Sequence, residues 1–179
     1  PTRRSSDLLK ETVVDIYQAS RDELAEVAGE DADPNDDWAG LVDTLQGKLV
    51  EPKLIQPTFI TVLPIDIWPL VKKHPDDPKV CEAFDGIVAG LEINGGGTDI
   101  NDPIEQRERF VGQRERQESG AEADPHPTDE EFVRALEYGM PPASGVGLGI
   151  DRLLMIMTGA KTLRDVIIYP AMRELPGEQ

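Results

Sequence analysis

The chain has 179 residues, of which 39% are hydrophobic, and its 35 acidic against 18 basic residues give a net charge of −17. This length can bury one sizeable core, whereas the acidity argues against the basic surface of a nucleic-acid binder. No apolar run approaches the roughly 20 residues of a membrane span, the N-terminus shows no signal-peptide pattern, and one cysteine with two histidines argues against a disulfide or a zinc site.

Two explanations of the acidity stay open. Either a surface that grips nucleic acid lies outside this chain, or the source is adapted to salt, where excess surface acid is common. The lone Cys81 fits a reducing cytoplasm, so we expect a cytoplasmic protein with no membrane partner.

The first third of the chain predicts two helices. Residues 1–6 lack apolar content and are set aside as a fragment edge. Apolar residues at helical spacing predict a helix over 7–29, the acidic run 30–37 predicts a loop, and Trp38 to Val50 predicts a second amphipathic helix.

The middle of the chain predicts strands and then helices. Alternating apolar and small residues predict an antiparallel hairpin over 80–101. Alternating charges predict a solvated helix over 102–117, followed by a loop over 119–127. Thr128 and Glu131 form a capping box that starts a helix ending at Tyr138. His74 and His126 are expected in surface loops.

The stretch 139–159 carries the strongest signal. Gly145, Gly147 and Gly149 alternate with apolar residues, which strips one face of a strand, so a ligand can lie against that backbone while the apolar face packs inward. Asp151 is expected to cap a following helix that Gly159 closes. Arg152 stands at the junction, where a planar cation can cover a flat ring.

This stretch resembles the third signature motif of the class II aminoacyl-tRNA synthetases. In that family the strand and helix form part of the ATP site, and the arginine lies on adenine, which assigns Arg152, Gly145, Gly147 and Gly149 to ATP. The continuation Thr162 to Arg173 is similar to the subclass of lysyl, aspartyl and asparaginyl enzymes, and most similar to the lysyl enzymes. The resemblance implies an α+β fold, with an antiparallel sheet flanked by helices.

A second stretch, Gly90 to Asp102, contains two acids seven residues apart, Glu92 and Asp99. Carboxylates suit the magnesium that accompanies ATP. On a regular strand these two would face opposite sides, and a bulge within Gly95–Gly97 would return them to one side. A glycine-rich hairpin with two exposed acids is the simpler alternative.

The resemblance also implies substrate roles. In lysyl enzymes the first acid binds metal and the second helps to bind metal and substrate, which assigns Glu92 to metal and ATP and Asp99 to metal and lysine, with Asn94, Gly95 and Gly97 in the substrate pocket. An acid at 99 favours a cationic side chain. Departures from the lysyl pattern are the glycines at 95 and 97, Leu91 in place of an arginine and the shorter acid at 99, and the glycine run itself resembles the aspartyl enzymes.

Trp68 is a further departure, because the family usually has a small serine there. We interpret it as a core aromatic, with a new wall of the substrate pocket as the alternative.

The resemblance covers 7–173, which corresponds to the C-terminal part of the catalytic domain, without the first and second signature motifs. We therefore expect a fragment of an enzyme that activates lysine with ATP and Mg²⁺ and transfers it to tRNA, and that forms a homodimer at full length. The alternatives are a paralogue that modifies a protein lysine, an aspartyl-like synthetase, and a non-catalytic binding module.

Overall fold

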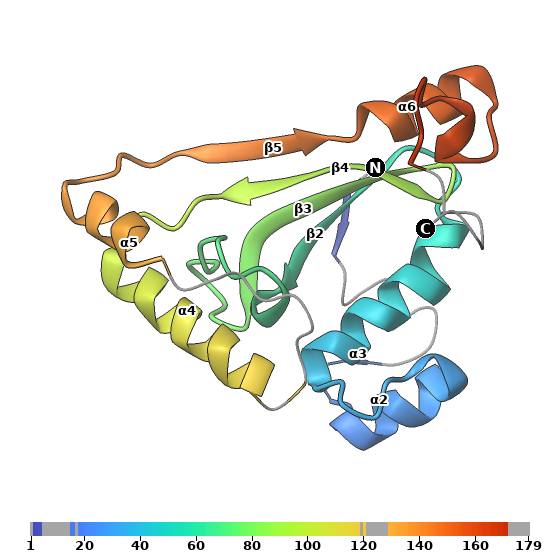
Figure 1. The fold of residues 1–179 in the computed structure, drawn as a ribbon. Coiled ribbons are helices and arrows are strands. Elements are labelled where there is room, and N and C mark those ends of the chain that lie inside the picture. Colours follow the sequence, from blue (N-terminus) through green and yellow to red (C-terminus); the bar gives the residue numbers. More distant parts are fainter. Residues whose placement is uncertain (1, 5–14, 17, 119, 121–128, 172–179) are drawn as a thin grey trace, which may run out of the picture.

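The structure is a computed structural model, and its element labels follow Figure 1. It describes residues 2–4 by their backbone, and in full 15–16, 18–118, 120 and 129–171.

One five-stranded sheet organises the chain, in the order β1-β2-β3-β4-β5 (Figure 1). The strands are β1 (Thr2–Arg4), β2 (Thr58–Pro64), β3 (Val80–Val88), β4 (Leu91–Thr98) and β5 (Ser144–Leu148). β1 runs parallel to β2, and every later pair is antiparallel. The predicted antiparallel sheet flanked by helices is confirmed.

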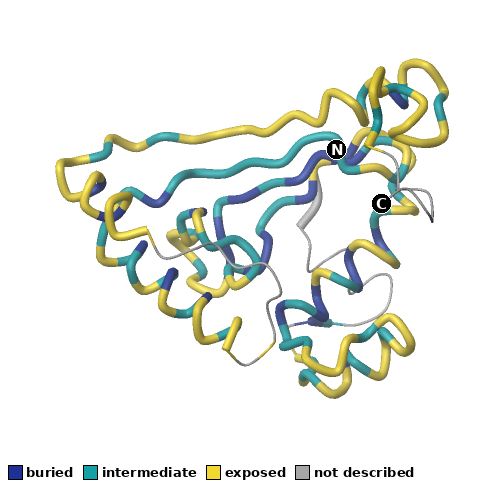
Figure 2. The backbone as a smooth tube through the Cα atoms, in the orientation of Figure 1, coloured by how far each residue is buried: buried dark blue, intermediate teal, exposed yellow. Residues whose placement is uncertain are grey.

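Helices lie below and beyond the sheet in the view of Figure 1. They are α2 (Arg21–Ala28), α3 (Trp38–Leu45), α4 (Pro103–Glu118), α5 (Glu130–Glu137) and α6 (Ile150–Thr158). Short helical turns are 3₁₀ at Gly29–Asp31, Glu51–Lys53, Ile65–Ile67 and Leu163–Asp165, and π at Gln46–Val50. The main core lies between β2, β3 and the α2–α3 pair, where the tube of Figure 2 is darkest.

The predicted helix over 7–29 is wrong in its extent. Helix α2 begins only at Arg21, because Ser20 caps it. The Ser20 backbone N–H donates to Glu23 Oε2 at 2.8 Å, and the Ser20 hydroxyl accepts from the Glu23 N–H at 3.3 Å. This reciprocal box ends the helix on its N-terminal side, and residues 15, 16 and 18–20 are not helical. The rest of the prediction falls on residues outside those described.

The second helix is confirmed over its whole predicted length. Asp37 caps α3 by accepting the Gly40 N–H at 2.9 Å, and the π-turn continues the helix to Val50. The acidic loop before it is also confirmed, apart from the 3₁₀ turn at its start.

The hairpin over 80–101 is confirmed as β3 and β4. Ala89 and Gly90 make its turn with φ of 53° and 76°, the paired left-handed conformation that matches the twist of two-residue hairpins. The helix predicted over 102–117 is α4. The predicted Thr128 cap lies outside the described residues; within them, Asp129 caps α5 by accepting the Phe132 N–H at 2.9 Å.

Strand β5 differs from the prediction in its environment. Val146 and Leu148 are 67% and 51% exposed, so its apolar residues do not pack inward. β5 is the edge of the sheet, and Figure 2 shows it exposed along its length. Asp151 is not the cap of α6 either: the N-cap is Gly149, two residues earlier, and Asp151 lies in the first turn of the helix. Gly159 ends α6 in the left-handed conformation, as predicted.

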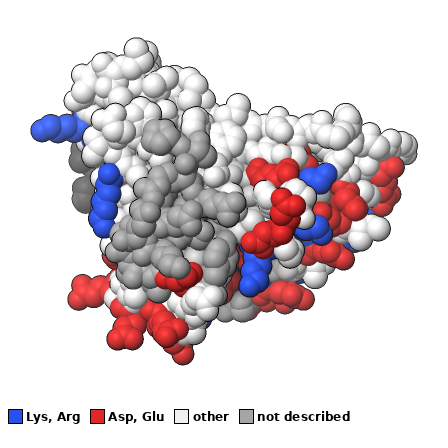
Figure 3. Space-filling model, turned by 180° about the vertical axis from the view of Figure 1, so that it is seen from behind, with Lys and Arg blue, Asp and Glu red and all other residues white. Residues whose placement is uncertain are grey.

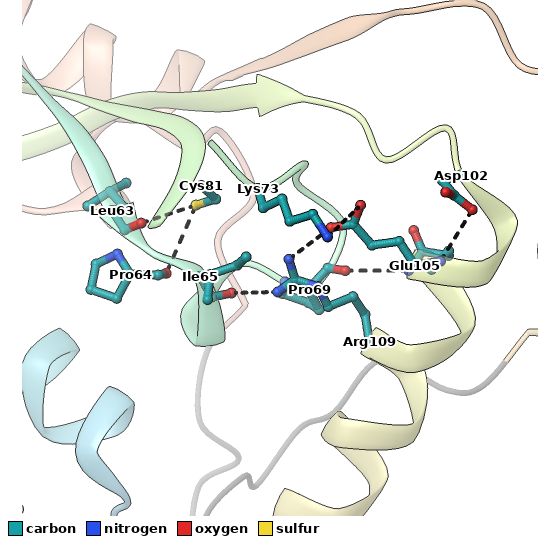
Figure 4. Close-up of polar contacts among 10 residues, drawn as sticks. Leu63, Pro64, Ile65, Pro69, Lys73, Cys81, Asp102, Glu105 and Arg109 are labelled. Carbon is teal, nitrogen blue, oxygen red and sulfur yellow. Dashed lines mark hydrogen bonds and ion pairs between the residues drawn. The ribbon is translucent and has the colours of Figure 1, made fainter. Parts of the chain in front are cut away.

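Cys81 is a structural residue. Its buried thiol donates to the Leu63 carbonyl at 3.4 Å (Figure 4), and burial raises its pKa to about 12. The thiol therefore stays protonated and takes no nucleophilic role.

Candidate functional site

The site forms where β4, β5 and the start of α6 meet. The β4–β5 register pairs Gly95 with Gly147 and Asn94 with Leu148. Beyond the last pair, the Gly149 N–H donates to the Ile93 carbonyl at 2.8 Å, which turns the chain into α6 beside β4. The glycine strand and the acidic strand, predicted separately, are therefore neighbours.

Arg152 is tied to Glu92 by this geometry. Its Nη1 donates to the Glu92 carbonyl oxygen at 2.8 Å and to the carboxylate Oε2 at 3.2 Å. Both side chains stay nearly half exposed, at 45% and 44%. The guanidinium is thus held at the rim of an accessible site.

A cavity of about 500 Å³ opens beside this pair. Six of the predicted site residues line it: Glu92, Asn94, Gly95, Gly147, Gly149 and Arg152. The lining also includes Trp68, which is half-buried and packs against the core on its other side. Trp68 therefore packs as a core aromatic, as interpreted, and also lines the cavity.

Gly97, Gly145 and Asp99 do not line this cavity. Asp99 forms a bridge with Val71, and its N–H donates to the Ala143 carbonyl at 2.9 Å. It lies seven residues along β4 from Glu92, or roughly 20 Å in an extended strand.

The predicted bulge exists but at a different place. Gly86 pairs with Asn94 and Ile87 pairs with Glu92, so the extra residue is Ile93 and not one of Gly95–Gly97. A Cβ on Gly86 would collide with the Asn94 amide oxygen, so the bulge coincides with a point where β3 must lack a side chain. The glycines at 95–97 keep a regular ladder.

The bulge brings Glu92 to the same face as a residue that the sequence analysis missed, Asp85. Ile87 pairs with Glu92, and side chains alternate along β3, so Asp85 shares that face. Asp85 is 9% exposed, and its Oδ1 lies 2.9 Å from where a Cβ of Gly95 would be.

Acidic groups surround this point. Burial first, and then the charges of Glu92, Glu51 and Asp43, raise the pKa of Asp85 to about 7. The pKa of Glu51 is also raised, by burial and then by Glu92 and Asp43. Such mutual repulsion is relieved by a bound cation.

Comparison of the sequence with known proteins identifies the family of the chain. A family model described as tRNA synthetases class II (D, K and N) matches residues 11–173. The chain belongs to this family of class II synthetases.

Its relatives include bacterial lysine–tRNA ligases. The chain is 48% identical to the one from Dehalococcoides mccartyi over 149 residues, which are 82% of this chain and 30% of the relative. It is 43% identical to the one from Thermosipho africanus over 176 residues, 97% of this chain and 35% of the relative. It is 50% identical to the one from Bacillus subtilis over 125 residues, 70% and 25% respectively. The chain thus spans about a third of the length of these relatives.

The two carboxylates of the site fit a magnesium ion. Mg²⁺ binds through one or two carboxylates and leaves its other positions to water and substrate phosphates. Asp85 and Glu92 supply two carboxylates on one face, and among the described residues no group of three or more histidine, cysteine or acidic side chains could hold a metal. That donor set suits an ion that arrives with a nucleotide.

A signal for Asp85 existed in the sequence. It is an acid within the apolar run Val80–Val88, and a charge inside such a strand is costly unless it has a role. The position of Asp85 opposite Gly95 follows only from the register of β3 and β4, which could not be derived from the spacing of residues in the sequence.

No described helix of this class II chain has the length and apolar character needed to cross a bilayer.

Proposed function

We propose that this chain is the C-terminal part of the catalytic domain of a lysine–tRNA ligase, which activates lysine with ATP and transfers it to tRNA. The observation that carries the proposal is the Arg152–Glu92 pair at the mouth of the cavity, joined to Asp85 by the bulge. Identities of 48% and 43% to two lysine–tRNA ligases support it.

In this proposal the glycine strand and Arg152 receive ATP. Gly147 and Gly149 line the cavity without side chains, so a flat nucleotide can approach the backbone. Gly145 lies at the far end of the same strand, and its Cβ position has no neighbour within 4 Å. Arg152 covers the adenine ring by a cation–π contact.

Asp85 and Glu92 would hold Mg²⁺, whose charge neutralises the phosphates. Glu92 was assigned to metal from the resemblance, and Asp85 replaces Asp99 as its partner because Asp99 lies too far along the strand for one ion. Asp99 stays the proposed acceptor of the substrate ammonium, with Asn94, Gly95 and Gly97 along the way. No covalent enzyme intermediate is needed, since positioning and electrostatics carry adenylate formation.

The proposed partners are lysine, tRNA held mainly by parts beyond this chain, and a second copy of the full-length protein; the proposed location is the cytoplasm. The alternatives are a paralogue that modifies a protein lysine, an aspartyl-like synthetase suggested by the glycine run, and a non-catalytic binding module.

The test is amino-acid-dependent pyrophosphate exchange by the full-length protein that carries this sequence, with lysine, ornithine, arginine and aspartate. We expect exchange with lysine and none with aspartate, because two like charges at Asp99 repel. Aspartate activation alone would refute the lysine assignment and support the aspartyl-like alternative. Lysine-dependent exchange without lysylation of tRNA would favour the paralogue. ATP binding without exchange for any amino acid would favour the binding module.

Arg152→Ala in the same protein should weaken ATP use by about 1–2 kcal/mol, or roughly 5- to 30-fold in KM for ATP. The matched control is Arg164→Ala, which removes an exposed arginine that does not line the cavity. An unchanged KM for ATP in Arg152→Ala would exclude the proposed stacking.

A further inference from the structure

Trp68 lies at a boundary of the cavity. It follows the 3₁₀ turn Ile65–Ile67, and its N–H donates to the Ile65 carbonyl at 3.2 Å. Its indole lies over β4, with Cη2 at 3.5 Å from the position of a Cβ on Gly95. The space above Gly95 is therefore already filled by the Asp85 carboxylate and by the indole, which is in van der Waals contact.

The next glycine of β4 continues this packing. A Cβ on Gly97 would lie 2.7 Å from Val71 Cγ1, so Val71 occupies the space above it. Gly95 and Gly97 share one face of the strand, and the segment from Trp68 to Val71 covers that face. The far end of this segment reaches Asp99, which pairs with Val71.

Helix α4 holds this segment in place through its backbone carbonyls. Arg109 Nη1 donates to the Ile65 carbonyl at 3.3 Å, Arg116 Nη1 to that of Asp66 at 2.7 Å, and Gln106 Nε2 to that of Pro69 at 3.4 Å. Figure 4 shows Arg109 reaching the Ile65 carbonyl from α4, with Pro69 beside it. These hydrogen bonds hold the turn that carries Trp68, and the indole forms a wall of the cavity.

We propose that Trp68 is a specificity-determining residue that restricts the amino-acid side of the pocket to a slender, unbranched cationic side chain. This inference rests on the proposed function. The methylene groups of a side chain whose ammonium lies at Asp99 can pack along the indole. A bulkier cation would have to displace an indole that lies against the core and a pinned turn.

The test compares Trp68→Ser and Trp68→Phe in the full-length protein that carries this sequence. Pyrophosphate exchange is measured with lysine and with Nε-trimethyl-lysine, which keeps the charge and adds bulk. When a pocket wall is removed, the discrimination between side chains of different size changes by about 10- to 200-fold. We expect Trp68→Ser to lower the ratio of kcat/KM for the two substrates at least about 10-fold, and Trp68→Phe to retain most of it.

Trp38→Phe is the control, since Trp38 does not line this cavity. Within these 179 residues it leaves Trp68 as the single tryptophan, and the fluorescence due to Trp68 is the difference between this variant and Trp38→Phe/Trp68→Phe. Its fluorescence should change on addition of lysine with ATP, whether or not the serine variant folds. A constant substrate ratio in a Trp68→Ser protein that still uses ATP normally would overturn the inference, as would unchanged Trp68 fluorescence under saturating lysine. No exchange with any amino acid in the unsubstituted protein would instead refute the proposed function.

Discussion

Asp85 is the residue whose environment departs most from that of an ordinary surface acid. Its pKa of about 7 exceeds the value of 3.8 for a free side chain, because burial and three nearby carboxylates oppose its ionisation. Between these two values the folded chain binds more protons than the unfolded chain. The contribution of Asp85 to the free energy of unfolding is therefore fully present below pH 3.8 and is lost as the pH rises through about 7.

Asp85→Asn should abolish this loss. We expect the variant to have a higher free energy of unfolding than the unsubstituted chain at pH 8, by up to about 4 kcal/mol, and a smaller difference at pH 5. Urea unfolding at the two pH values measures it. Asp76→Asn, at an exposed loop position, is the charge-matched control.

Magnesium gives the same experiment a second readout. If Asp85 and Glu92 bind Mg²⁺, the ion should stabilise the unsubstituted chain more at pH 8 than at pH 5, and should not stabilise Asp85→Asn. Equal stabilisation of both proteins by Mg²⁺ would exclude Asp85 as a ligand.

At the scale of elements, the pairing of β4 with β5 depends on a side-chain-free contact. A Cβ on Gly96 would collide with the carbonyl oxygen of Gly145, whereas a Cβ on Gly145 would meet nothing within 4 Å. Overpacking against rigid backbone costs about 1–3 kcal/mol. Gly96→Ala should therefore lower the free energy of unfolding by that amount, and Gly145→Ala should leave it nearly unchanged.

Chemical denaturation of the two variants decides the point, with Gly145→Ala as the matched control on the facing strand. Equal stability of the two proteins would mean that β5 shifts to accommodate the methyl group, and that the close approach is not required by the fold.

Elements with a strong local pattern were predictable from the sequence. The β3–β4 hairpin, the π-extended α3 and α4 carry clear periodicity, and Gly159 ends α6 as its position predicts. The start of α2 was also readable, since Ser20 and Glu23 form a capping box, but periodicity alone extended the helix backward. The exposure of Val146 was not readable, because the layer that covers a strand is decided by the whole fold.

The site was predictable in its parts and less so in its assembly. Glu92, Arg152 and two of the three glycines of the 145–149 stretch do line one cavity. The bulge at Ile93, and with it the position of Asp85, depends on which residues of β3 lie opposite β4. Strand register is a long-range property, so spacing within β4 could not decide it.

For the whole molecule, charge is the dominant surface property. The net charge is −17, and the face drawn in Figure 3 shows acidic side chains in two groups, one at the lower left and one along the right side. Exposed ion pairs such as Lys48–Asp31 each contribute only about 0–1 kcal/mol. Repulsion among 35 acidic residues should therefore outweigh what such pairs contribute.

Salt should stabilise the chain as a consequence. Raising NaCl from about 0.1 to 1 M shortens the screening length from about 10 to 3 Å, so we expect the free energy of unfolding to increase by about 1 kcal/mol or more. Thermal unfolding across this range measures it, with sucrose as an uncharged control. A decrease with NaCl would show that attractive pairs dominate, and would remove support for a salt-adapted source.

The bond between Arg152 and Glu92 has two parts that respond differently to a cation. A metal ion held by the Glu92 carboxylate would compete with the guanidinium for that group, while the Glu92 carbonyl would keep its own bond to Arg152 Nη1, at 2.8 Å in the structure. The arginine would then pivot about a fixed point and would not be released. Occupancy by one of the two proposed ligands would thereby set the orientation of the group proposed to receive the other. Such heterotropic linkage is reciprocal: the factor by which metal changes nucleotide affinity is the factor by which nucleotide changes metal affinity.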